Sequence, residues 1–221
     1  MKIRHALGVA ALAVSGLAHS AAIDWNQWSS NTATTFDGTI TTGSGPVGVS
    51  FSGDTSGGFY TAYPSWLPAA TWADGSVVAN GPSGGIVRLL GGNATVDTIT
   101  FSAPVTNPVF SIWSLGQGGV TASFDFIGAT PVLVAGGSNA EYGGSSISVS
   151  GNVVSGNEGN GTVEFLGTYS SISWTNPDFE NWYGFNVGIA GVAGTVPEPA
   201  SIGLMLAALT LIGLTRRQQS R

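Results

Sequence analysis

Apolar and polar residues alternate with a period of two through the middle of the chain, between residues 23 and 195. This period places successive side chains on opposite faces of a β-strand, so that one face can be buried. No segment in this region has the 3.6-residue period of an amphipathic helix. We count about ten predicted strands, and the alternation is clearest at residues 47–51, 99–101, 110–112, 122–126, 132–134, 147–149, 163–165, 172–174 and 185–189.

Turn-forming residues separate these strands at intervals of roughly ten residues. Thirty of the 34 glycines of the chain lie in this middle region. Short strands with Gly-rich turns are typical of antiparallel sheets packed face to face. We therefore predict one all-β domain at residues 23–195, an antiparallel β-sandwich of jelly-roll-like form. A β-solenoid is the alternative, and the lack of a fixed-period repeat in the sequence weighs against it.

The first 22 residues differ in composition from this middle region. Lys2 and Arg4 precede an apolar run, and small residues follow at Ser20 and Ala22. This order predicts a secretory signal peptide at residues 1–22 that is cut after Ala22, with a cut after Ser20 as the alternative.

The last residues of the chain contain a second apolar segment. Residues 200–215 carry no charge, and Arg216 and Arg217 follow them directly. A helix of this length spans roughly 24 Å, less than the hydrocarbon core of about 30 Å. The pattern predicts a short transmembrane helix with a cytoplasmic stop at the arginines, so that the domain lies outside the cytoplasm. Pro197 and Pro199 keep the preceding chain extended, where a protease could reach it.

The tail as a whole resembles the PEP-CTERM sorting signal of Gram-negative bacteria, over residues 196–221. The resemblance lies in Pro197, Glu198 and Pro199, followed by the apolar segment and the terminal arginines. It implies that exosortase, a membrane-embedded protease or transpeptidase, recognises the tail and cuts near these three residues. It also implies a precursor anchored in the inner membrane and a product at the cell surface, outer envelope or extracellular matrix. An ordinary C-terminal membrane anchor is the alternative.

The region between the two signals is strongly acidic. It has one basic residue, Arg88, against eleven acidic residues, a net charge of about −10. Such a surface has nothing to neutralise phosphates, so nucleic acid and anionic lipid are not expected partners. The region also lacks histidine, cysteine and lysine. This composition excludes Ser-His-Asp and Cys-His nucleophiles, His/Cys zinc sites and Schiff-base lysines. The enzymes that this composition still allows are those that use carboxylates alone, such as glycosidases. We predict that the protein is not an enzyme.

Aromatic residues are concentrated between Gly57 and Trp72, in a segment without alternation. Rings exposed on a β-sandwich can stack on the apolar faces of sugars. The candidate glycan-binding residues are Tyr60, Tyr63, Trp66 and Trp72. The alternative is that these rings cap an open end of the sandwich.

Residues 174–183 are predicted to form a hairpin loop between two strands. Asn176, Asp178 and Glu180 are candidate calcium ligands, because their oxygen atoms suit calcium and alternate residues of an extended chain share a side. A purely structural turn is the alternative, since the spacing is not that of an EF-hand. Asn157, Glu158 and Asn160 form a weaker candidate set, and no other cofactor is expected.

Together these patterns predict an exported protein with a structural or adhesive role in a surface or biofilm matrix, with exopolysaccharide as a candidate partner. The alternative is a lectin-like glycan-binding module, which calcium could assist by bridging its acidic surface to acidic polysaccharide. A carboxylate-dependent glycosidase is the third hypothesis.

Overall fold

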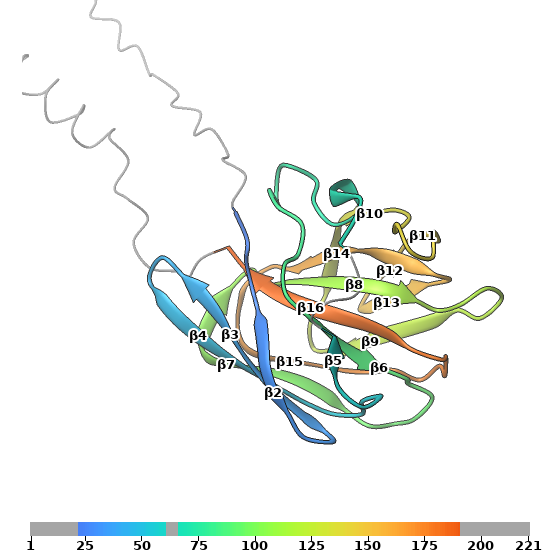
Figure 1. The fold of residues 1–221 in the computed structure, drawn as a ribbon, viewed down its shortest axis with the longest axis horizontal. Coiled ribbons are helices and arrows are strands. Elements are labelled where there is room, and N and C mark those ends of the chain that lie inside the picture. Colours follow the sequence, from blue (N-terminus) through green and yellow to red (C-terminus); the bar gives the residue numbers. More distant parts are fainter. Residues whose placement is uncertain (1–21, 61–65, 191–221) are drawn as a thin grey trace, which may run out of the picture.

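Two β-sheets packed face to face form the fold (Figure 1). The computed structural model describes residues 22–60 and 66–190, and of Tyr60 the backbone only. Each sheet has eight strands, and all pairs but one are antiparallel in the described residues. The prediction of an all-β antiparallel sandwich is confirmed.

The sheet that we call sheet 1 has the strand order β10-β14-β8-β16-β6-β5, with β1 beside β16 and β11 beside β14. The pair of β11 and β14 is the parallel one. The strands of sheet 1 are β1 (Asp24–Trp25), β5 (Phe59–Tyr60), β6 (Ile86–Leu89), β8 (Val109–Leu115), β10 (Pro131–Gly136), β11 (Ser145–Ser146), β14 (Gly159–Phe165) and β16 (Tyr183–Ile189).

The opposing sheet, sheet 2, has the strand order β12-β13-β9-β15-β7-β4-β3-β2. Its strands are β2 (Gln27–Asn31), β3 (Thr35–Thr42), β4 (Gly45–Ser52), β7 (Asp97–Thr106), β9 (Ala122–Ile127), β12 (Ser148–Ser150), β13 (Val153–Gly156) and β15 (Thr168–Thr175).

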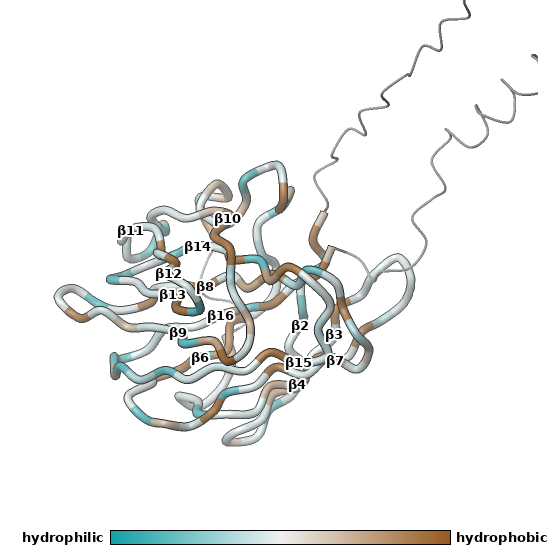
Figure 2. The backbone as a smooth tube through the Cα atoms, turned by 180° about the vertical axis from the view of Figure 1, so that it is seen from behind, coloured by the Kyte–Doolittle hydropathy of each residue, from teal (hydrophilic) through white to brown (hydrophobic). Residues whose placement is uncertain are grey.

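Aromatic side chains from both sheets fill the space between them. Phe110 and Phe185 lie on neighbouring strands of sheet 1 and stack with ring centroids 5.6 Å apart. Trp174 of sheet 2 meets Phe110 edge-on at 5.6 Å. All three side chains are completely buried, and burial of each contributes roughly 1.5–3 kcal/mol. The alternation that produces this core is visible in Figure 2, where hydrophobic positions recur between pale ones along the strands.

Several strands, among them β1, β2, β3 and β6, lie outside the segments with the clearest alternation. In β3 the inward positions are Phe36, Gly38, Ile40 and Thr42, so a glycine and a threonine interrupt the apolar pattern. Gly38 has to be small, because a Cβ atom there would lie 2.5 Å from Asn26 Oδ1. Close packing between strands therefore requires small residues at some inward positions, and these residues weaken the alternating pattern from which strands are predicted.

The prediction of a hairpin at residues 174–183 is wrong. Strand β15 belongs to sheet 2 and strand β16 belongs to sheet 1, so the segment between them crosses from one sheet to the other. We call residues 176–182 the crossover. Both strands have a clear local pattern, but that pattern does not specify which neighbour each strand pairs with.

Residues 66–85, which precede β6, form a segment that covers the outer face of sheet 1. It contains the short 3₁₀-helix η1 (Ala69–Thr71). Trp72 follows this helix, is completely buried, and donates from Nε1 to the Ile112 carbonyl on β8 at 3.5 Å. The Trp72 carbonyl accepts a hydrogen bond from Thr162 Oγ1 on β14 at 2.8 Å. The covering segment thus packs on the outer face of sheet 1 and forms a further layer of the fold.

The two ends of the described chain lie side by side. Strand β1 pairs with β16, and Asp24 stands opposite Ile189. In Figure 1 the blue start of the chain therefore meets its orange end at one side of the molecule. Within residues 22–60 and 66–190, no helix has the length and apolar character needed to cross a membrane. The predicted C-terminal helix lies outside these residues.

Candidate functional site

A small pocket of about 190 Å³ lies at the end of the sandwich where β8 finishes and β16 begins. Four separate segments supply its walls: the end of β8 with its following turn, the turn before β11, the turn between β13 and β14, and the crossover. We call it the end pocket. Its lining residues are Ser114, Gln117, Tyr142, Glu158, Glu180, Asn181 and Trp182.

The side chain of Asn160, on β14, holds three of these segments together. Its Oδ1 atom accepts hydrogen bonds from the Ser114 N–H and from Asn139 Nδ2, each at 2.8 Å. Its Nδ2 atom donates to the carbonyls of Gly143 and Glu158 at 3.3 and 3.0 Å. Because the side chain is completely buried, these bonds satisfy an amide that water cannot reach. One residue thereby fixes the relative positions of three walls.

Tyr142 stands on a turn that is anchored to this amide. Asn139 Oδ1 accepts hydrogen bonds from the N–H groups of Glu141 and Tyr142, at 2.9 and 2.6 Å. This is the geometry in which an asparagine side chain stabilises a turn. The Tyr142 ring meets Trp113 edge-on at 5.3 Å and remains 52% exposed. The pocket therefore has an open aromatic ring on a fixed support.

Ser114 and Glu158 both have left-handed backbone conformations, with φ of 54° and 53°. Such conformations cost a residue other than glycine about 1–3 kcal/mol and are enriched at functional sites. Ser114 Oγ donates to Glu158 Oε2 at 2.6 Å. The two unfavourable conformations place this hydroxyl and this carboxyl group together in the wall of the pocket.

Glu180 brings a second carboxyl group to the end pocket. Its side chain is only 3% exposed. Its Oε1 atom accepts the Trp182 N–H at 3.1 Å, and the Gly116 N–H also lies near enough to this carboxyl group to lower its pKa. Its buried Oε2 atom makes no hydrogen bond within normal distance and angle in the described residues. Burial raises the pKa of Glu180 to about 7, and the nearby charge of Glu158 acts in the same direction. At neutral pH this carboxyl group can therefore donate or accept a proton.

Trp182 is fixed between aromatic and basic neighbours. It stacks on Trp113 with ring centroids 5.0 Å apart and an interplanar angle of 20°. The Cζ atom of Arg88, from β6, lies 4.7 Å from the centre of the Trp182 ring, a cation–π contact. Arg88 itself does not line the pocket.

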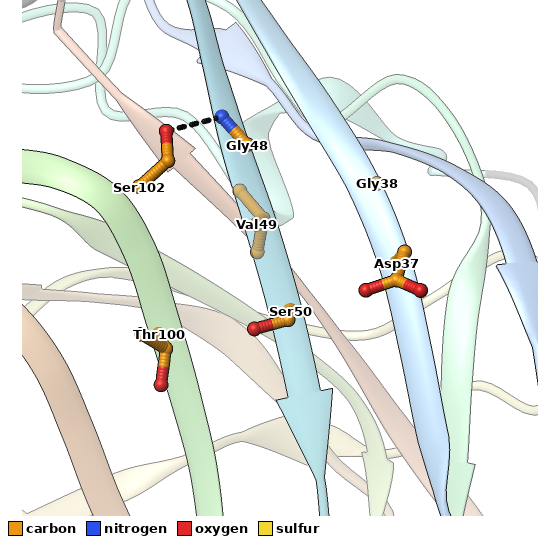
Figure 3. Close-up of a pocket in the computed structure, with 7 residues that line it drawn as sticks. All are labelled: Asp37, Gly38, Gly48, Val49, Ser50, Thr100 and Ser102. Atoms are coloured by element: carbon orange, nitrogen blue, oxygen red, sulfur yellow. Dashed lines mark hydrogen bonds between the residues drawn. The ribbon is translucent and has the colours of Figure 1, made fainter.

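A second depression, of about 350 Å³, lies on the outer face of sheet 2 (Figure 3). Pairing between β4 and β7 ends at Val49 and Phe101, and beyond this point Ser102 Oγ accepts the Gly48 N–H at 2.8 Å. This depression contains one carboxylate, that of Asp37, and no aromatic ring. We call it the sheet groove, and its lining residues are Asp37, Gly38, Gly48, Val49, Ser50, Thr100 and Ser102.

The aromatic residues predicted to bind glycans are placed differently from that prediction. Trp72 is completely buried and so has no ring face open to a sugar. Trp66 is half-buried, meets Trp72 edge-on at 5.2 Å, and donates from Nε1 to the Gly84 carbonyl at 3.2 Å. Both rings belong to the layer over sheet 1. Tyr63 and the side chain of Tyr60 lie outside the described residues.

The three predicted calcium ligands of the crossover have different partners in the structure, and their role in binding calcium stays a prediction. Asn176 uses both ends of its amide, accepting from Trp174 Nε1 at 2.9 Å and donating to the Ser123 carbonyl at 2.7 Å. Asp178 accepts from Ser123 Oγ at 3.2 Å, whereas Glu180 lines the end pocket. Within the described ranges, no group of three or more His, Cys, Asp or Glu side chains could hold a metal ion. This arrangement favours the structural alternative for Asn176.

Sequence patterns did not single out Ser114, Gln117 or Tyr142. Serine and glutamine are common on protein surfaces and carry no signal of their own. Tyr142 does carry one, since it is a large aromatic residue within a turn rich in glycine. Glu158 and Glu180 were candidates as calcium ligands, in two separate sets, and the fold brings these two carboxyl groups to one pocket.

The C-terminal tail defines the class of the protein. An all-β domain followed by a C-terminal sorting motif is the organisation of an exported protein that is sorted through the membrane. The particular motif is the PEP-CTERM protein-sorting motif, whose family model matches residues 195–221. The predicted resemblance is confirmed, and it implies processing by exosortase, a membrane protein. No curated protein and no solved structure matches the chain.

The matched segment contains all the residues that are predicted to act in sorting. Pro197, Glu198 and Pro199 form the predicted processing motif, and Arg216 and Arg217 form the predicted cytoplasmic stop. All five lie outside the described residues, so their individual roles stay predictions.

Proposed function

We propose that this exported protein is an adhesive component of the cell surface or its matrix, and that it binds glycans in the end pocket. The observation that carries the proposal is that one pocket holds both an exposed aromatic ring, that of Tyr142, and a buried carboxyl oxygen without a hydrogen bond, Oε2 of Glu180. A folded domain rarely leaves a buried carboxyl oxygen without a partner. Glu180 lines the pocket, so a ligand hydroxyl group there would bond its carboxyl group.

The chemistry of the end pocket suits a sugar. Sugar hydroxyl groups both donate and accept hydrogen bonds, and the pocket offers carboxyl, hydroxyl and amide groups within a small volume. Tyr142 adds a ring on which the apolar face of a sugar can stack. A pocket of about 190 Å³ is smaller than the pockets of roughly 300–1,000 Å³ that hold drug-sized ligands. It therefore suits one or two rings at the end or edge of a polysaccharide chain.

The position of the end pocket also favours adhesion. Strand β16 begins at the pocket with Tyr183 and ends at Ile189, beside the first strand. At about 3.4 Å per residue, its seven residues separate the pocket from the tail by roughly 20 Å. A domain tethered through its C-terminal tail would thus present the pocket away from its point of attachment.

A glycan array probed with the full chain, purified in detergent, tests the proposal. We expect binding to a limited set of oligosaccharides, and a loss of at least about tenfold in affinity for Tyr142→Ala, as is usual for an aromatic anchor. Phe179→Ala is the matched control, because Phe179 is 61% exposed on the crossover but does not line the pocket. An equal loss in both variants, or binding by neither parent nor variants, would contradict the proposal.

We further propose that the end pocket binds without cleaving. The support is the composition of the domain, whose lack of histidine, cysteine and lysine leaves carboxyl groups as the side chains available for acid–base catalysis of hydrolysis. The two carboxyl groups of Glu158 and Glu180 make the alternative, a glycosidase, testable. Incubation of each glycan bound on the array should release no new reducing ends. Release that disappears in Glu158→Gln would establish the glycosidase instead.

A further inference from the structure

Acidic side chains greatly outnumber basic ones in the domain, and the same is true of the lining of the end pocket. Residues 23–195 contain eleven acidic side chains against the single basic residue Arg88. The pocket has two carboxyl groups in its lining, those of Glu158 and Glu180, and no basic side chain. Arg88 is held over the Trp182 ring and stays out of the lining. An anionic ligand would meet uncompensated repulsion here, whereas a cationic ligand would be attracted.

The two carboxyl groups of the pocket lack a compensating charge. Within residues 22–60 and 66–190, the hydrogen bond to Glu158 Oε2 comes from the neutral hydroxyl of Ser114, at 2.6 Å. Glu180 Oε2 is buried without any partner in the described residues. The proximity of Glu158 disfavours a negative charge on Glu180. A positively charged donor between these two groups would bond both carboxyl groups and remove the repulsion between them.

We propose that the end pocket receives the ammonium group of an amino sugar, so that the ligand is a polysaccharide with free amine groups. The inference rests on the proposed function and names the class of glycan. The ammonium group donates three hydrogen bonds, to Glu158, Glu180 and a further lining oxygen such as that of Gln117. The sugar ring that carries the amine lies against Tyr142. An N-acetylated sugar would bring a neutral amide to the same place and leave the carboxyl groups uncompensated.

Two other cations fit the pocket less well. A divalent metal ion is held by several oxygen ligands and has no apolar face to lie against Tyr142, and the pocket supplies two carboxyl groups in its lining. A lysine side chain of a protein partner carries the same ammonium group but has no ring to lie against Tyr142. The amino sugar uses both the acidic and the aromatic part of the site.

Isothermal titration calorimetry with chemically matched oligosaccharides tests the inference on the full chain in detergent. We compare a glucosamine tetrasaccharide with its fully N-acetylated form and with a short lysine peptide, all at pH 7. We expect the free-amine form to bind at least about tenfold more tightly than the N-acetylated form. Glu180→Gln and Glu158→Gln should each reduce that preference to less than about threefold. Asp37→Asn, which removes one charge from the sheet groove, should preserve it.

The outcomes separate this inference from the proposed function. Equal affinity for the two tetrasaccharides overturns the amine inference and leaves glycan binding intact. A lysine peptide that binds as tightly as the glucosamine tetrasaccharide overturns the role of the sugar ring. Failure of every oligosaccharide here and on the array overturns both. Thermal unfolding of each variant shows whether a lost preference reflects a lost fold, and two independent Gln variants keep the test decisive if one is unstable.

Discussion

At Asn160, one amide group bonds four partners in three segments that are distant along the chain. The sequence around Asn160 does not predict that it joins these segments, because an Asn-Gly dipeptide is an ordinary turn signal. Its importance comes from burial, because a buried amide must find its partners within the protein. The end pocket therefore depends on a residue that does not line it.

Replacement of Asn160 with alanine tests this dependence. The change leaves the N–H of Ser114 and the amide of Asn139 without their buried acceptor, and each such loss costs about 1–3 kcal/mol. We expect the free energy of unfolding, measured with urea, to fall by at least about 2 kcal/mol. Asn157→Ala, an exposed change in the adjacent turn, should alter it by less than about 0.5 kcal/mol. Similar effects of the two changes would refute the assigned role.

A buried carboxyl group on β7 gives the domain a distinctive pH dependence. Asp97 is 2% exposed and accepts the Asp54 N–H at 2.7 Å. Burial raises its pKa from 3.8 to about 7, although this hydrogen bond opposes the shift. Between these two values the folded state holds a proton that the unfolded chain has released, so stability falls as pH rises through this window. Glu180, whose pKa burial also raises to about 7, acts in the same direction.

We therefore expect the free energy of unfolding to be lower at pH 8 than at pH 5, by an amount on the order of 2 kcal/mol. Urea denaturation at the two pH values measures it. Asp97→Asn should reduce the difference, because asparagine keeps an acceptor for Asp54 but does not titrate. The low pKa of Asp74, about 2, has its effect only below about pH 4 and does not enter this comparison. Stability that rises from pH 5 to pH 8 would be incompatible with a buried, protonated Asp97.

At the scale of elements, the layer over sheet 1 explains the concentration of aromatic residues before β6. Trp72 lies in a cluster with Ile86 and Trp113, against which Trp66 and Trp182 pack. This cluster joins the covering segment to the strands that carry the end pocket. Two of the rings predicted to bind a ligand, Trp66 and Trp72, thus hold two layers together.

Trp72→Ala should therefore act on stability. Removing a completely buried aromatic side chain costs about 3–5 kcal/mol through lost burial and the cavity left behind. We expect a fall of this size in the free energy of unfolding, measured by urea denaturation. Phe179→Ala, at an exposed aromatic position, should cost less than about 1 kcal/mol. A Trp72→Ala variant as stable as the parent would show that the layer does not contribute to the fold.

The class of fold could be predicted from the sequence because strands such as β9 have a clear alternation of apolar residues. Ala122, Phe124 and Phe126 all point to the core, and the local pattern says so directly. The crossover was misjudged because partner choice depends on contacts between strands that are far apart along the chain. The end pocket was missed for the same reason, since its seven lining residues come from four separate segments.

At the scale of the whole molecule, both ends of the described chain meet at one side, and the end pocket lies at the start of β16, on the other side (Figure 1). The predicted N-terminal signal and the PEP-CTERM signal therefore join the domain at neighbouring points. Ile23 is well placed to be the first residue of the mature chain, because the side chain of Asn80 bonds both its N–H and its carbonyl, at 2.7 and 2.9 Å. Removal of both signals would leave the paired strands β1 and β16 in place.

Intact mass spectrometry of the protein recovered from its native cells tests the two processing events. We expect a chain that begins at Ile23, or at Ala21 if the alternative cut is used, and that ends near residues 196–199. A mass that still includes Arg221 would show that the tail is retained as an anchor and would remove the exosortase step.

Whether a ligand occupies the end pocket is tested by titrating the isotope-labelled full chain in detergent and following its amide NMR signals. The probe is the oligosaccharide that binds best in the array. We expect shifts concentrated at the segments around Ser114, Tyr142, Glu158 and Glu180, with the strands of the sheet groove unchanged. Shifts confined to the groove around Ser50, or a spectrum unchanged at saturating glycan, would contradict glycan binding in the end pocket.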